Sequence, residues 1–151
     1  MKSINKILLA LAILLPPQAF SGAWDYGSFD NDSAADWVYE LDQSKTTRYL
    51  LTVFNAVPSS GYIDVDVCSV AIAAAEVTAS LKDGKTQNLP KSVANWVQVN
   101  KPDYKVALAA RATEILGYCK DTKRSELAQL WDEGDSVKWF SNISVLGARL
   151  Q

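Results

Sequence analysis

Residues 24–41 read W-D-Y-G-S-F-D-N-D-S-A-A-D-W-V-Y-E-L, an irregular, aromatic and acidic lead-in that runs directly into a predicted helix. Gly27 favours a tight turn, and the run D-N-D at residues 30–32 favours turns because Asp and Asn side chains bond to nearby backbone. Behind this run, apolar residues recur at i, i+3, i+4 and i+7, which is one face of a helix. These residues are Ala34, Trp37, Val38 and Leu41. The stretch therefore predicts an entry loop, a helix start and one buried helical face.

The acidic cluster at the helix start has two interpretations. Asp32 or Ser33 can cap the helix by accepting bonds from its first N–H groups, and Ser33 with Asp36 fits a capping box with Asp in place of Glu. The acids also partly fit a calcium loop, but an alanine and a leucine stand where an EF-hand requires its glycine and its glutamate. We therefore interpret the cluster as a helix cap and expect no metal. It comprises Asp30, Asn31, Asp32, Ser33 and Asp36.

A family resemblance rests on two motifs. These are G-A-W-D-Y-G-S-F-D-N-D-S-A-A-D-W at residues 22–37 and A-A-A-E-V at residues 73–77. Together they resemble the bacterial family called domain of unknown function 4259, whose members usually open with G-A-W-G-x-G-x-F-x-N-D-x-A-x-D. Here Asp25 replaces one of those glycines. The resemblance covers nearly the whole mature chain; it implies a fold and assigns no reaction.

Residues 1–21 have the three parts of a secretory signal peptide: two lysines, an unbroken apolar run at residues 7–15, and small residues before a cut expected after Ser21. The apolar run is far shorter than the ~20 residues of a membrane-spanning helix. We therefore expect a periplasmic or secreted protein that starts at Gly22. Removing the two lysines from 15 basic residues leaves 13 against 17 acidic ones, a formal net charge of −4.

The remainder, residues 22–151, is predicted to be a single all-α domain, a compact bundle of about six to seven helices with an irregular N-terminal lead-in, because helical periods continue with short connections between them. Residues 62–81 carry two neighbouring apolar stripes, which predicts a central helix buried on most sides. The alternation V-D-V-D-V near its start is also compatible with a strand. The other helices are expected at residues 44–56 and 90–99, from Pro102 onward, at residues 124–131, and after a cap at Asp135 or Ser136.

Catalytic chemistry is scarce in this sequence. It has no histidine, no nucleophile elbow and no phosphate-binding glycine loop, and two distant cysteines do not make a zinc site. Its mild acidity and its lack of basic clusters argue against nucleic acid. A carboxylate-only hydrolase stays open, with Glu76 and Asp36 as candidates, although a paired carboxylate and a cap are their simpler roles. The sequence singles out no catalytic residue and no cofactor.

The two cysteines predict how two of the helices pack against each other. In an oxidising compartment Cys68 and Cys119 are expected to form a disulfide. Each lies near one end of its helix, so the bond requires the two helices to run antiparallel or to cross steeply. Eight residues inward from each cysteine, Glu76 and Arg111 then reach the same level, and we predict a partly buried ion pair between them. Eight residues turn a helix by about 80°, so the pair can also lie beside the contact.

Five Trp and six Tyr are many for this length, and most are expected in the core. The inward tryptophans are Trp37, Trp96, Trp131 and Trp139. Trp24, Asp25 and Tyr26 are candidates for contact with another protein, because exposed aromatic residues dominate such interfaces. We expect an exported protein-binding domain without catalytic activity, in its specific form an immunity protein against a toxin delivered to the periplasm. A carboxylate-only hydrolase and a structural envelope module are the alternatives.

Overall fold

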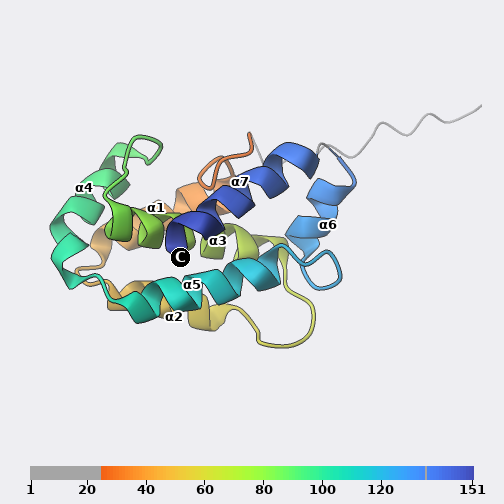
Figure 1. Cartoon of the computed structure of the whole chain (residues 1–151), viewed down its shortest axis with the longest axis horizontal. Coiled ribbons are helices and arrows are strands. Elements are labelled where there is room, and N and C mark those ends of the chain that lie inside the picture. Colours follow the sequence, from red (N-terminus) through yellow and green to blue (C-terminus); the bar gives the residue numbers. More distant parts are fainter. Residues whose placement is uncertain (1–24, 135) are drawn as a thin grey trace, which may run out of the picture.

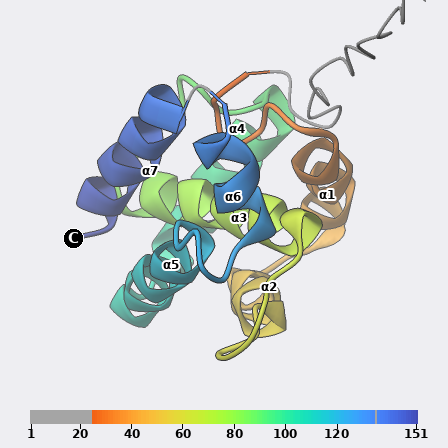
Figure 2. The same cartoon turned by 90° about the vertical axis from the view of Figure 1, so that its right-hand side faces the viewer.

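Helix α3 (Val65–Asp83) lies at the centre of the computed structural model, which describes residues 25–134 and 136–151. Twelve of its 19 residues are buried, and most of these are alanine, serine or another small residue. Small side chains allow neighbours to approach from all sides, and each of the other described α-helices packs against α3 (Figures 1 and 2). The predicted central position of this helix is therefore correct.

The described residues form seven α-helices and no sheet, which confirms the all-α prediction. The V-D-V-D-V segment is helical from Val65 onward. Besides α3, the elements are α1 (Asp32–Gln43), α2 (Arg48–Ala56), α4 (Lys91–Asn100), the 3-10 helix η1 (Lys101–Asp103), α5 (Val106–Cys119), α6 (Glu126–Asp132) and α7 (Ser136–Leu150).

Three helices start three or more residues later than predicted. Helix α2 starts at Arg48, not at residue 44, because the Ser44 N–H donates to carbonyls of α1 and ends that helix. Helix α3 starts at Val65 because Ile63 is extended: its N–H donates to the Arg124 carbonyl at 2.8 Å, forming part of a parallel bridge. Pro102 lies in η1, and α5 follows at Val106.

Helices α3 and α5 lie side by side and run antiparallel (Figure 1). A disulfide joins Cys68, near the start of α3, to Cys119, the last residue of α5, with a Cα–Cα distance of 5.4 Å. Both cysteines are completely buried. The bond therefore fixes the position of α5 along the central helix.

The core contains three of the four tryptophans predicted to point inward: Trp37, Trp96 and Trp139 are buried, while Trp131 is half-buried. The predicted signal peptide, at residues 1–21, and Trp24 lie outside the described residues. Within the described part of the chain, no helix has the length and apolar character needed to cross a membrane.

Candidate functional site

The lead-in, residues 25–31, forms a closed turn before α1. The Asp30 N–H donates to the Gly27 carbonyl at 3.1 Å, and the Gly27 N–H donates to the Asp30 carboxylate at 2.9 Å. A Cβ atom at residue 27 would overlap this carboxylate, so any larger residue there would have to displace it. Glycine at residue 27 therefore leaves room for the Asp30 side chain, which closes the turn.

Asn31 is the residue that caps α1. Its backbone is extended and its side-chain oxygen accepts from the Ala34 N–H at 2.8 Å. The predicted cap at Asp32 or Ser33 was therefore wrong by one or two positions, because the turn that Asp30 closes leaves Asn31 in the cap conformation. The predicted capping box is replaced by another contact, since the Ser33 hydroxyl donates to Asp66 at 2.6 Å. Asp36 is exposed on α1.

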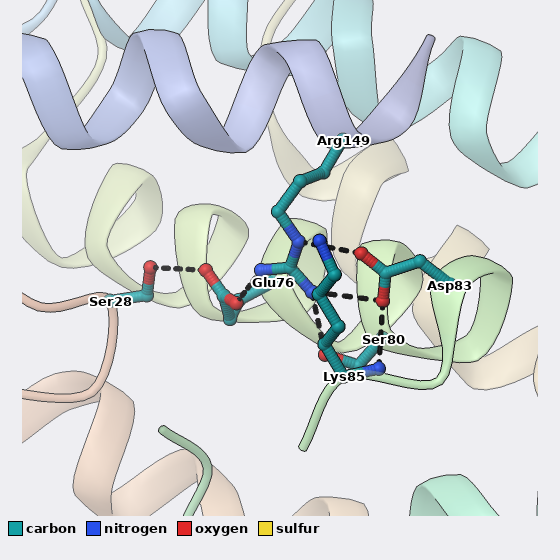
Figure 3. A network of polar contacts seen from close by, with 6 residues as sticks. All are labelled: Ser28, Glu76, Ser80, Asp83, Lys85 and Arg149. Atoms are coloured by element: carbon teal, nitrogen blue, oxygen red, sulfur yellow. Dashed lines mark hydrogen bonds and ion pairs between the residues drawn. The ribbon is translucent and has the colours of Figure 1, made fainter. Parts of the chain in front are cut away.

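Glu76 joins the lead-in to two helices. The Ser28 hydroxyl donates to one of its carboxylate oxygens at 3.2 Å, and Arg149 of α7 pairs with the other (Figure 3). The Glu76 and Arg149 side chains are only 16% and 18% exposed. Glu76 interrupts the alanine-rich part of α3, and this interruption is now explained: it is the point where the lead-in, α3 and α7 meet.

Arg149 uses its remaining donors on the last turn of α3 (Figure 3). Its Nε and Nη2 donate to the two Asp83 oxygens at 2.8 and 3.2 Å, and Nη2 also donates to the Ser80 hydroxyl at 3.2 Å. Burial acts to raise the pKa of Asp83, but hydrogen bonds from Arg149 and from the Lys85 backbone N–H outweigh it, so the pKa lies below its ordinary value. We call these contacts of Ser28, Glu76, Ser80 and Asp83 the Arg149 network.

The predicted Glu76–Arg111 pair does not form. Arg111 bonds with Glu114 on its own helix at 2.6 Å and reaches the Phe54 carbonyl of α2 at 3.5 Å. The disulfide does align α3 with α5, but the eight-residue step from each cysteine rotates both side chains away from the contact. Glu76 consequently faces α7, and Arg111 faces α2.

The Arg149 network borders an open cleft of about 400 Å³, the lead-in cleft. Its lining comes from the lead-in, from Glu76 of α3, from Asn88, and from α7: Gly27, Ser28, Phe29, Asp30, Asn142, Val145, Leu146 and Arg149. A shallower hollow of about 330 Å³ adjoins it and shares Gly27 and Asn142 with it. We call this second depression the lead-in hollow.

Two of the three predicted partner-binding residues line the lead-in hollow. Asp25 is exposed, whereas Tyr26 is half-buried. The Tyr26 ring packs on Trp131 with 5.3 Å between centroids, Lys138 of α7 lies 5.1 Å above it, and Asn142 donates to its carbonyl at 3.0 Å. The third residue, Trp24, lies outside the described residues.

The structure separates the two carboxylates considered for catalysis. Glu76 lines the lead-in cleft, and both of its oxygens accept bonds from within the chain. Asp36 lies on the exposed side of α1 and does not line that cleft. Among the described residues, no group of three or more His, Cys, Asp or Glu side chains is arranged to hold a metal. The geometry is that of a polar cleft bordered by ion pairs between α3 and α7 and by a hydrogen bond from the lead-in.

This arrangement defines an all-α domain with a polar cleft between its N-terminal lead-in and its last helix. The sequence matches the family described as domain of unknown function (DUF4259) over residues 22–142. The chain therefore belongs to this family, as its motifs predicted. The match includes the lead-in and Glu76 and ends before Arg149. No curated protein and no solved structure matches the chain significantly.

Proposed function

We propose that the protein is an exported protein-binding domain without catalytic activity, and that its partner contacts the lead-in face. We define this face as residues 25–30 together with the outer side of α7 at residues 137–145. The observation that carries the proposal is the pair of adjoining depressions, the lead-in cleft and the lead-in hollow, which lie on one continuous stretch of surface.

The composition of the lead-in face suits a partner protein. Val137 and Val145 are 77% and 59% exposed, and they lie among polar and charged groups such as Asp25, Lys138 and Asn142. Non-obligate protein–protein interfaces likewise combine apolar and polar surface. The Arg149 network anchors both sides of the face, and a surface that is already ordered loses less entropy when it binds.

In its specific form the partner is a toxin delivered into the same compartment, and the protein is an immunity protein. The predicted signal peptide, the small size of the domain and its formal charge of −4 after cleavage support this form. Surplus negative charge accelerates association with a basic partner and disfavours acidic ones.

Capture from a periplasmic extract tests the proposal. Tagged wild-type protein is expected to retain a partner, and Val137→Asp is expected to weaken retention at least about tenfold, a loss of about 1.4 kcal/mol in binding free energy. Val106→Asp is the matched control, because Val106 is also 77% exposed and also lies in the first turn of a helix. If both variants captured the partner equally well, the partner would not bind at the lead-in face. An extract that yields no partner would favour the structural envelope module.

A further inference from the structure

A second depression lies on another part of the molecule, between α1, α2 and α3. Helices α1 and α2 each pack on α3 but do not pack closely on each other, as Figure 2 shows. The groove between them has a volume of about 400 Å³ and shares no lining residue with the lead-in cleft or the lead-in hollow. Its floor is apolar, with Val53, Val67 and Val70 half-buried and open to solvent on one side. We call it the α1–α2 groove.

Hydrogen bonds fix the groove at both ends. At one end the Trp37 and Tyr49 rings stack at 6.3 Å, and the Tyr49 hydroxyl donates to Glu40 at 2.7 Å. Burial and this bond to Glu40 raise the pKa of Tyr49 to about 12, so the hydroxyl keeps its proton at neutral pH. At the other end, the bond from Ser33 to Asp66 ties α1 to α3. The groove therefore exists before any partner arrives.

The net negative charge of the chain after residue 21 equals the charge of α1, one of the three helices that line this groove. Helix α1 contains four acidic residues and no Lys or Arg. Without α1, the chain after residue 21 has 13 basic and 13 acidic residues, so α1 accounts for the whole excess of negative charge. Asp32, Asp36 and Glu40 are all exposed and follow one another at four-residue intervals, which puts them on one face of the helix. Of these three residues Glu40 lines the groove, as does Asp66 of α3, and Asp36 precedes Glu40 by one helical turn on the same face of α1. We call Asp36 and Glu40 with their neighbour Asp32 the acidic stripe.

We propose that the α1–α2 groove binds an amphipathic helix of a partner protein, with its apolar side on the three valines and its Lys or Arg residues against the acidic stripe. An apolar groove with a charged edge is the usual receptor for such a helix. The 12 residues of α1 span about 18 Å, which matches about three turns of the partner. A second copy of this chain that docked groove to groove would bring the same acidic stripe and be repelled. This surface is separate from the lead-in face, and the inference does not depend on it.

Two designed helical peptides of about 14 residues serve as probes. They share one apolar face and carry Lys or Glu at the same polar positions, and binding is measured by calorimetry and by amide chemical shifts of the mature protein. We expect the Lys peptide alone to bind, with shifts confined to α1, α2 and the first half of α3, and with affinity that falls as salt rises. The double variant Asp36→Asn/Glu40→Gln is expected to lower its affinity about tenfold by removing two of the charges.

Ala56→Lys tests the groove itself. Ala56 is exposed at the end of α2 and lines the groove, so a lysine there both fills the groove and repels the probe. Ala110→Lys, at an exposed position of α5, adds the same charge elsewhere and is expected to bind the Lys peptide like the wild type. Thermal unfolding confirms that both variants fold.

Several results would overturn the inference: no binding of the Lys peptide, equal binding of both peptides, or equal binding to Ala56→Lys and Ala110→Lys. A dimer of the free protein with its interface in the groove would identify a second copy as the occupant and would also overturn it. Val137→Asp must leave the affinity for the Lys peptide unchanged. If it weakens binding, the peptide occupies the lead-in face instead, so the failures of the two proposals can be told apart.

Discussion

Arg149 shows what one residue contributes to this fold. Its planar guanidinium donates to both Asp83 oxygens while another nitrogen pairs with Glu76, which the single ammonium group of a lysine cannot reproduce. Periodicity identified Glu76 as unusual but not its partner, because the two residues are 73 positions apart and spacing along a helix does not show which neighbour a side chain faces. One indication was available: Arg149 lies three residues after Leu146 and next to Leu150, both on the buried stripe of α7.

The Arg149 network predicts a graded loss of stability. Arg149→Ala leaves Glu76 and Asp83, with side chains only 16% and 20% exposed, without their cation. We expect the free energy of unfolding to fall by about 2 kcal/mol, less than the 3–5 kcal/mol of a fully buried pair because solvent still reaches both groups. Arg149→Lys should lose roughly half as much.

Arg111→Ala is the matched control for Arg149→Ala. Its pair with Glu114 is more exposed and spans three residues of one helix, so Arg111→Ala should lower the free energy of unfolding much less than Arg149→Ala does. Urea unfolding of the wild type and the three variants measures these differences. Similar losses for Arg149→Ala and Arg111→Ala would mean that the network does not stabilise the packing of α7.

Helix faces were easier to predict than helix ends. The stripe of Trp139, Ile143, Leu146 and Leu150 in α7 is at most 5% exposed, because apolar periodicity reports directly which face is removed from water. Ends depend on bonds to distant segments. The start of α3 is set by the contact of Ile63 with Arg124, and no local pattern near Ile63 indicates that partner.

The corrected cap of α1 predicts how two neighbouring substitutions differ in their effect on stability. Asn31→Ala removes the acceptor of the Ala34 N–H and should lower the free energy of unfolding by about 1 kcal/mol. Asp32→Ala removes only a first-turn carboxylate, so the loss should be a few tenths of a kcal/mol, the effect of a charge near the helix N-terminus. Chemical unfolding of both variants gives the ranking. A larger loss for Asp32→Ala than for Asn31→Ala would show that Asp32, and not Asn31, caps the helix.

The fold brings together motifs that lie far apart in the sequence. Ser28 belongs to the opening motif and Glu76 to the alanine-rich motif, and these two side chains form a hydrogen bond. Two parts of the candidate site could therefore be singled out from the sequence: the lead-in and Glu76. The sequence did not indicate Asn142, because an exposed polar residue on a surface helix has no pattern of its own until the fold places it beside a cleft. It indicated Arg149 only through the position of this residue beside the buried stripe of α7.

The disulfide is the one covalent link between distant parts of the described chain, and it predicts how stability depends on redox state. Cys68 and Cys119 are 51 residues apart, so their bond restricts the unfolded chain by about 4 kcal/mol in the chain-entropy model. That is a large fraction of the 5–15 kcal/mol that stabilises a typical domain. Helix α3 contacts each of the other described α-helices, so releasing α5 from it should weaken the whole bundle and not one helix alone.

Reduction of the disulfide should therefore lower the midpoint of urea unfolding strongly in a single transition. The double variant Cys68→Ala/Cys119→Ala supplies the control, because its midpoint should already be low and should not change when reductant is added. Thiol titration of unfolded protein purified without reductant should find no free thiol. Two free thiols, or one midpoint for the wild type with and without reductant, would contradict the prediction. A loss confined to α5 in amide exchange would instead show that the bond secures a local contact, since local opening leaves the rest of a structure protected.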